Sequence, residues 1–143
     1  MIDMEALDLS KKPPRSPWVK VGGAFMLART IDKLRASLPG GNMGVYRIPG
    51  FSEALLRAIG AEEEELRGVV ARAANDDEVA AWVTSRADPA RLERYNDRSS
   101  KRTIADVEDK QDFFRRYPGT EKLALDTPLF DALDKDDAQM FAG

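Results

Sequence analysis

The chain has 143 residues and a net charge of −3, and it contains neither cysteine nor histidine. These absences exclude disulfides, thiolate or imidazole nucleophiles, and the zinc sites that depend on either side chain. Any catalysis would have to use carboxylates, amines, hydroxyls or backbone groups, and any metal would need oxygen ligands. We therefore predict no catalytic residue, no metal and no cofactor, and the composition weighs against an enzyme.

Length and hydropathy favour a single domain in the cytoplasm. A chain of this size suits one domain and buries roughly two-thirds of its unfolded surface. The first residues are acidic where a secretory signal is basic, and no run approaches the roughly 18 apolar residues of a membrane helix. We expect a cytoplasmic location and no membrane partner.

Charge is divided unevenly along the chain. Residues 1–60 contain nine basic and five acidic residues, whereas residues 61–143 contain thirteen basic and twenty acidic ones. Nucleic-acid binding requires a strongly basic domain, so a nucleic-acid partner is not expected. A positive face that meets a negative face of a second protomer would support self-association, although a solvated surface of uneven charge is the simpler interpretation.

Residues 1–19 are predicted to form an extended arm packed on a helical domain of residues 20–143. Prolines at positions 13, 14 and 17 hold its backbone extended. The apolar residues of the arm are Leu7, Leu9, Trp18 and Val19. Because they are too apolar for a free tail, we expect Trp18 to be largely buried as an anchor; a proline-rich ligand for a partner protein is the alternative.

The first helix is predicted over residues 23–38, because Leu27, Ile31, Leu34 and Leu38 recur at helical spacing. Pro39 and the two glycines that follow it end this helix. Residues 44–48 alternate apolar and polar side chains, which favours a short strand or an extended segment.

The remaining patterns are helical. A short helix over residues 51–59 closes at Gly60, and four acids at 62–65 begin the next one, which extends to residue 75. Asp76 is predicted to cap the following helix, and Asp88 with Pro89 to start another.

Two more helices complete the pattern. Thr103 or Asp106 is predicted to open one, and Thr127 with Pro128 to start a short last one before an acidic tail over 134–143. Six or seven short helices with at most one extended piece make the predicted class all-α, as a single compact domain.

The predicted first helix carries Arg29, Asp32, Lys33 and Arg35 within seven residues. Arg29 and Arg35 lie three residues before and after Asp32, so both can reach its carboxylate. One interpretation is a structural salt-bridge cluster that ties this helix to a neighbour. The other is an anion site in which the cations hold a carboxylate or a phosphate.

Two other charged stretches have simpler interpretations. Residues 91–102 hold five cations around Tyr95, but acids at helical spacing favour a solvated helix over an RNA site. A carboxylate cluster is formed by Asp131, Asp134, Asp136 and Asp137. It lacks the glycine and the final glutamate of a calcium loop, so a weak magnesium site is only the lesser alternative there.

Several of these motifs together resemble a known family. The run Pro13-Pro14-Arg15-Ser16-Pro17, the motif Ile31-Asp32-Lys33-x-Arg35-Ala36, the pair Gly44-x-Tyr46 and the triplet Ala81-Trp82-Val83 resemble a bacterial domain-of-unknown-function family, number five thousand and sixty-nine. The resemblance spans nearly the whole chain. It implies a small cytoplasmic bacterial domain without an assigned activity, and it carries over no catalytic residue.

The sequence leaves two function hypotheses open. The favoured one is a protein-interaction domain, with a homodimer as one form. The alternative is a small-ligand domain or weak enzyme in which a cation cluster binds an anion, Tyr46 supplies a polar tip and Asp32 orients the cations. The cations of that cluster are Arg15, Arg29, Lys33 and Arg35.

Overall fold

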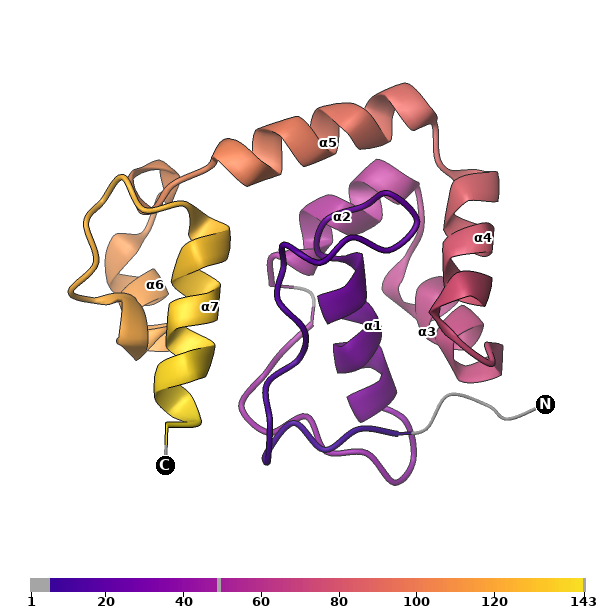
Figure 1. The fold of residues 1–143 in the computed structure, drawn as a ribbon, viewed down its shortest axis with the longest axis horizontal. Helices are drawn as coiled ribbons and strands as arrows, with labels where there is room; N and C mark the ends of the chain where they lie inside the picture. Colours follow the sequence, from indigo (N-terminus) through magenta and orange to yellow (C-terminus); the bar gives the residue numbers. More distant parts are fainter. Residues whose placement is uncertain (1–5, 49, 143) are drawn as a thin grey trace.

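The computed structural model describes residues 6–48 and 50–142, and in these residues the chain is helical, with isolated backbone bridges in place of a sheet (Figure 1). This confirms the predicted all-α class. The elements are α1 (Leu27–Ala36), α2 (Ser52–Ile59), α3 (Glu63–Arg72), α4 (Asp76–Arg86), α5 (Pro89–Lys101), η1 (Ile104–Asp106), α6 (Lys110–Arg116), η2 (Pro118–Thr120) and α7 (Leu129–Met140), where η marks a 3-10 helix. None of the described helices is long and apolar enough to cross a membrane.

Helix α5 joins two groups of helices (Figure 1). Helices α1 to α4 lie on one side and α6, η2 and α7 on the other, while α5 contacts both α2 and α7. The larger apolar core lies among α1 to α5 and includes Phe130 from α7. A smaller core around Ile104, Phe113 and Leu129 holds η1, α6 and α7 together.

The N-terminal arm runs between α1 and α7 (Figure 1). Leu9 is buried against Ala36 and Tyr46, and its backbone N–H donates to the carbonyl of Asn42 at 2.8 Å. Residues 1–5 of the predicted arm lie outside the described residues.

Trp18 attaches the arm to α7. Its ring packs edge-on against Phe25 and Phe130, with centroids 5.5 and 5.0 Å away. Its indole Nε1 donates to Asp131 Oδ1 at 2.8 Å. Trp18 is partly buried against the main core, and the hydrogen bond holds the polar edge of the indole beside the exposed Asp131.

The first helix begins at Leu27, four residues later than predicted. Val21 and Ala24 exchange two backbone hydrogen bonds of 3.2 and 3.0 Å, which close a turn where the helix was expected. The N–H of Met26 then donates to the carbonyl of Pro17 at 2.9 Å, and Met26 has a φ of 71°. The arm therefore takes the hydrogen bond that a longer helix would use.

Residues 44–45 form a turn, residues 46–47 are irregular and residue 48 lies in a bend, where a short strand or an extended segment was predicted. Gly44 has a φ of 57°, and a Cβ at this position would lie 2.8 Å from the backbone oxygen of Leu9. Only glycine fits such a close approach at this φ. The segment therefore packs as a turn against the arm, and it does not pair with a second strand.

One predicted helix end and one predicted helix start are confirmed, and two other predicted starts are displaced. Gly60 ends α2 with a φ of 78°, and Asp88 with Pro89 starts α5. However, α3 ends at Arg72 and does not extend to residue 75. Asn75, and not Asp76, caps α4, and its side-chain oxygen accepts from Glu78 N at 3.1 Å. Thr103 opens only the short η1, and Asp109 caps α6.

The largest difference lies at the C-terminus, where α7 continues to Met140 through most of the predicted acidic tail. Three aspartates of this segment have partners on other elements. Asp134 accepts from the Ser16 hydroxyl at 2.9 Å, and Asp136 accepts from the N–H of Gly119 at 2.9 Å. Asp137 pairs with Arg29. These contacts make the segment a packed helix; Gly143 lies outside the described residues.

Replacing Trp18 by alanine tests the attachment of the arm. The variant loses two aromatic contacts and the hydrogen bond to Asp131, so we expect a loss of about 2–3 kcal/mol, below the ~3–5 kcal/mol typical of a fully buried aromatic residue. The measurement is the free energy of unfolding in urea. The neighbouring Val19→Ala is the control, because Val19 is exposed and should change stability by only about 0.5 kcal/mol. Equal midpoints for the two variants would show that the arm is not held by Trp18.

Candidate functional site

Helix α1 carries most of the predicted site residues, and it is buried along nearly its whole length. Of its ten residues only Arg35 falls outside the buried class. Arg29, Asp32 and Lys33 are therefore charged residues inside the protein, with exposed fractions of 1, 5 and 5 %. A buried charge is costly unless it is paired or neutralised, so the partners of these three residues determine what the site can do.

Asp32 is paired with the arm. Arg15 donates to its carboxylate from the backbone N at 2.8 Å, from Nε at 3.1 Å and from Nη2 at 3.1 Å. The same guanidinium reaches Asp76 at the start of α4, with Nη1 to Oδ2 at 2.5 Å. The hydrogen bond to Asp76 is the largest factor that raises the pKa of Arg15 above its ordinary value.

Arg29 is paired with α7, and not with Asp32 as the spacing predicted. Its Nη1 donates to Asp137 Oδ2 at 2.7 Å and its Nη2 to Oδ1 at 3.3 Å. Nη1 also lies 3.3 Å from the carbonyl oxygen of Arg15, which it donates to. Arg29 pairs with Asp137 because Arg15 already occupies both oxygens of Asp32, and Asp137 offers a buried carboxylate on another helix.

Tyr46 belongs to the same buried group. Its hydroxyl donates to Asp137 Oδ1 at 2.6 Å, and its ring lies 5.5 Å from the guanidinium carbon of Arg29. Burial, and then the hydrogen bond to Asp137, raise the pKa of Tyr46 above its ordinary value. Tyr46 therefore keeps its proton and donates a hydrogen bond that holds the Asp137 carboxylate in place.

Lys33 differs from Arg15 and Arg29 because its amine donates a hydrogen bond to a backbone carbonyl. Its Nζ donates to the carbonyl oxygen of Arg47 at 3.2 Å and lies 6.0 Å from the centre of the Tyr46 ring. Burial, and then the charge of Arg29, lower the pKa of Lys33 to about 7, partly against the attraction of Asp137. The Lys33 amine therefore loses its proton at a much lower pH than an exposed lysine does.

The structure brings Arg15, Arg29, Asp32, Lys33 and Tyr46 together where the arm crosses α1. Arg35 lies at the edge, with its Nη1 4.0 Å from Asp32 Oδ1. Since carboxylates of the protein already face the arginines, the contacts favour the structural interpretation of the cluster. The role of these six residues in binding a ligand stays a prediction.

Two partners of the cluster were missed from the sequence, namely Asp76 and Asp137. Asp76 was interpreted only as a helix cap. Asp137 was grouped with Asp131 and Asp134 as a carboxylate cluster, yet the spacing of these three, at every third residue, already placed them on one face of a helix. In the described residues no group of three acidic side chains is arranged to hold a metal ion.

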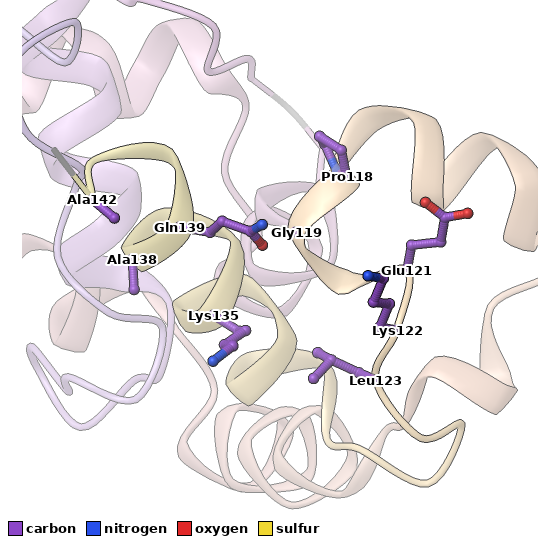
Figure 2. A pocket seen from close by; sticks show the side chains of 9 residues that line it. All are labelled: Pro118, Gly119, Glu121, Lys122, Leu123, Lys135, Ala138, Gln139 and Ala142. Carbon is purple, nitrogen blue, oxygen red and sulfur yellow. The ribbon is translucent and has the colours of Figure 1, made fainter.

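The hollows of the surface lie away from this cluster. Figure 2 shows an open groove of about 490 Å³ between η2 and α7, where the Gln139 side chain extends toward Gly119. A second hollow of about 230 Å³ lies between α2 and α5. None of the six predicted site residues lines either hollow.

The structural interpretation is tested by Asp137→Asn. The variant leaves Arg29 buried without its counter-ion, so we expect a loss of about 3–5 kcal/mol, a large part of the ~5–15 kcal/mol that stabilises a domain. Asp97→Asn is the matched control, because it breaks the exposed Lys101–Asp97 pair and should cost at most about 1 kcal/mol. The measurement is a urea melt with and without phosphate.

A ligand role for the cluster would give the opposite pattern. Arg29→Met would be at least as stable as the wild type, and it would lose a stabilisation by phosphate that Arg102→Met retains.

The lowered pKa of Lys33 predicts a pH effect on stability. The folded pKa of about 7 lies below the ordinary value of 10.5. Between these values the unfolded chain binds a proton that the folded protein does not, so stability rises with pH across this window. We expect Lys33→Met to remove this rise, which can reach about 1.4 kcal/mol per pH unit.

The measurement is the free energy of unfolding of both proteins from about pH 7 to about pH 10. Because the folded pKa of Tyr46 is raised, Tyr46 lowers the stability as pH rises, but only above its ordinary pKa of 10.0. Lys135→Met, at an exposed position of α7, should keep the wild-type profile. If the free energy of unfolding changes with pH in the same way for the wild type and Lys33→Met, the lowered pKa of Lys33 is contradicted.

Comparison with known proteins gives a family without an assigned activity. No curated protein matches the chain. The model of the family described as Domain of unknown function (DUF5069) matches residues 11–139, a stretch that includes the arm from Lys11, the buried charge cluster and nearly all of α7. The chain therefore belongs to the DUF5069 family.

Proposed function

We propose that this protein is a protein-interaction domain of the bacterial cytoplasm, and that it binds an acidic segment of a partner protein on the exposed face of α5. The observation that carries the proposal is a row of arginines without internal partners. Arg91, Arg94 and Arg98, the α5 arginine face, make no ion pair or side-chain hydrogen bond with the described part of the chain.

The geometry of α5 presents these arginines together. Only Leu92 and Tyr95 of its thirteen residues are buried. At helical spacing the three arginines fall within an arc of about 60°, on the flank of the buried side. Figure 1 shows α5 along one edge of the molecule, where a partner can reach it.

Several other surface arginines are engaged within the protein. Arg57 pairs with Glu53, Arg67 with Glu63 and Arg86 with Glu65. On the α5 arginine face the charges are instead available to carboxylates of another molecule. Arginine is enriched at protein interfaces, and clusters of arginine recognise acidic motifs.

Two further features support a protein partner over the alternatives. The net charge of −3 and a pI of about 5.1 disfavour nucleic acid, which needs a strongly basic domain. A cation cluster occupied by the protein's own carboxylates disfavours an enzyme site at Arg15 and Arg29. The lack of cysteine suits the reducing cytoplasm.

The test is the binding of a fluorescent glutamate-rich peptide, followed by anisotropy. We expect saturable binding that weakens with salt, and a loss of about tenfold when Arg91, Arg94 and Arg98 are all changed to serine. The matched control changes three exposed cations elsewhere to serine, namely Lys11, Arg47 and Lys122. It alters the net charge equally and should weaken binding by less than about twofold.

Three results would count against the proposal. The control variant could weaken binding as much as the α5 variant does. A single-stranded RNA of equal charge could bind more tightly than the peptide. Finally, sedimentation could show a dimer that only the α5 variant dissociates, in which case a second copy of the chain would take the place of the acidic partner.

A further inference from the structure

The hollow between α2 and α5 combines two guanidinium groups with an aromatic floor. Its volume is about 230 Å³, roughly that of eight water molecules in the liquid. Phe51, Tyr95 and Phe130 supply aromatic rings, while Arg57, Arg102 and Ser99 supply hydrogen-bond donors. Such a mixture of apolar surface and a few convergent polar groups is typical of small-ligand sites.

Arg102 is the residue of this hollow that most favours the binding of an anion. Its side chain is half-buried, yet it makes no ion pair or hydrogen bond with the residues that the structure describes. A guanidinium that loses water without gaining an anion is in an unfavourable state. A bound oxyanion would remove this cost through charge-assisted hydrogen bonds, which can be bidentate.

Arg57 can contribute to the same anion. It pairs with Glu53, with Nη2 to Oε1 at 2.5 Å, but the side chains of both partners are exposed, at 71 and 56 %. Exposed pairs of this kind are weak, so Arg57 can exchange the Glu53 carboxylate for an anion of a ligand. Glu53 also lines the hollow, where its charge would oppose the entry of an anion.

We propose that the hollow between α2 and α5 is a binding site for a small oxyanion carried on a short apolar or aromatic group, with Arg102 and Arg57 holding the oxyanion and Phe51, Tyr95 and Phe130 contacting the apolar part. The oxyanion is a carboxylate or a phosphate, which share this chemistry. The site is separate from the α5 arginine face, because Arg91, Arg94 and Arg98 do not line the hollow.

The larger groove of Figure 2 fits such a ligand less well. Its cations are the exposed Lys122 and Lys135, and the acidic Glu121 also lines it. Exposed lysines are strongly hydrated and gain less from an anion than a half-buried arginine does.

The experiment titrates the full chain with phenyl phosphate, benzoate and inorganic phosphate, and with benzyl alcohol as the uncharged analogue. Binding is measured by calorimetry, and its place by the backbone amide NMR shifts of residues 50–57 and 95–102. We expect phenyl phosphate or benzoate to bind one per chain, inorganic phosphate to bind more weakly, and benzyl alcohol not to bind measurably. The stronger of the two aromatic anions identifies phosphate or carboxylate as the preferred group.

Variants test whether Arg102 and Arg57, and not the overall charge of the protein, determine the affinity for the anion. Arg102→Met and Arg57→Met keep an apolar stem and should each weaken binding at least about fivefold. Glu53→Gln removes the opposing carboxylate and should strengthen binding by about twofold to fivefold. Arg72→Met, an exposed position on α3, is the control and should leave affinity unchanged.

Three outcomes would overturn the inference: no saturable binding of any of the three anions, benzyl alcohol binding as tightly as the anions, or an affinity that Arg102→Met does not change. The melting temperatures of the variants are measured alongside, and Arg57→Met and Glu53→Gln keep the test decisive if Arg102→Met fails to fold. Because Arg102→Met leaves the α5 arginine face intact, peptide binding and anion binding can fail independently.

Discussion

The buried ion pair between Arg29 and Asp137 determines where the two ends of the chain lie. Arg29 is 1 % exposed, and such a side chain needs a counter-ion within the protein. Its counter-ion lies near the end of α7, so the C-terminal helix must pack beside α1. Arg29 also donates to the backbone of Arg15 and shares Asp137 with Tyr46, so the arm and the loop before α2 follow from the same constraint.

The acidic C-terminal segment is used mainly for internal contacts. Asp131 accepts from Trp18 and Asp134 from Ser16, which fastens α7 to the arm. Asp136 accepts from the N–H of Gly119, where a Cβ would lie only 2.7 Å from Gln139 Oε1. Each aspartate thus meets a different donor, and this explains why the four carboxylates do not gather into a metal site among the described residues.

The protein separates cations that stabilise the fold from cations that remain available. Arg15 and Arg29 are occupied by Asp32, Asp76 and Asp137, and they connect the arm to α1, α4 and α7. Arg91, Arg94, Arg98 and Arg102 lie on or directly after α5 without such partners in the described residues. This contrast is the physical basis for placing recognition on α5 and the hollow beneath it, and stability on α1.

Lys33 stands between these two groups. Its amine is enclosed with the arginines but donates to a backbone carbonyl, and burial keeps its pKa close to neutral. Burial of an amine in this state costs less than burial of a full charge. A lysine with the same spacing on an exposed helix would be an ordinary surface residue, so only its surroundings make it distinctive.

Local patterns in the sequence were sufficient for the helical class and for several helix ends. The stripe that includes Leu27, Ile31 and Leu34 predicted α1, and Asp88 with Pro89 predicted the start of α5, because these signals act between neighbouring residues. The sequence also showed that charges crowd around Asp32. What it could not show is which carboxylate each arginine would choose, since Asp137 lies 108 positions from Arg29.

Only the tertiary structure decided the pairing of charges, and with it the length of α7 and the late start of α1. Spacing along one helix favoured Arg29 with Asp32, but the fold places Asp137 beside Arg29 and Arg15 beside Asp32. The sequence by itself determined an all-α chain without cysteine or histidine chemistry, because composition and short-range periodicity suffice for that. The partners of its buried charges depended on which distant segments the folded chain brings together, because desolvation acts only where the fold excludes water.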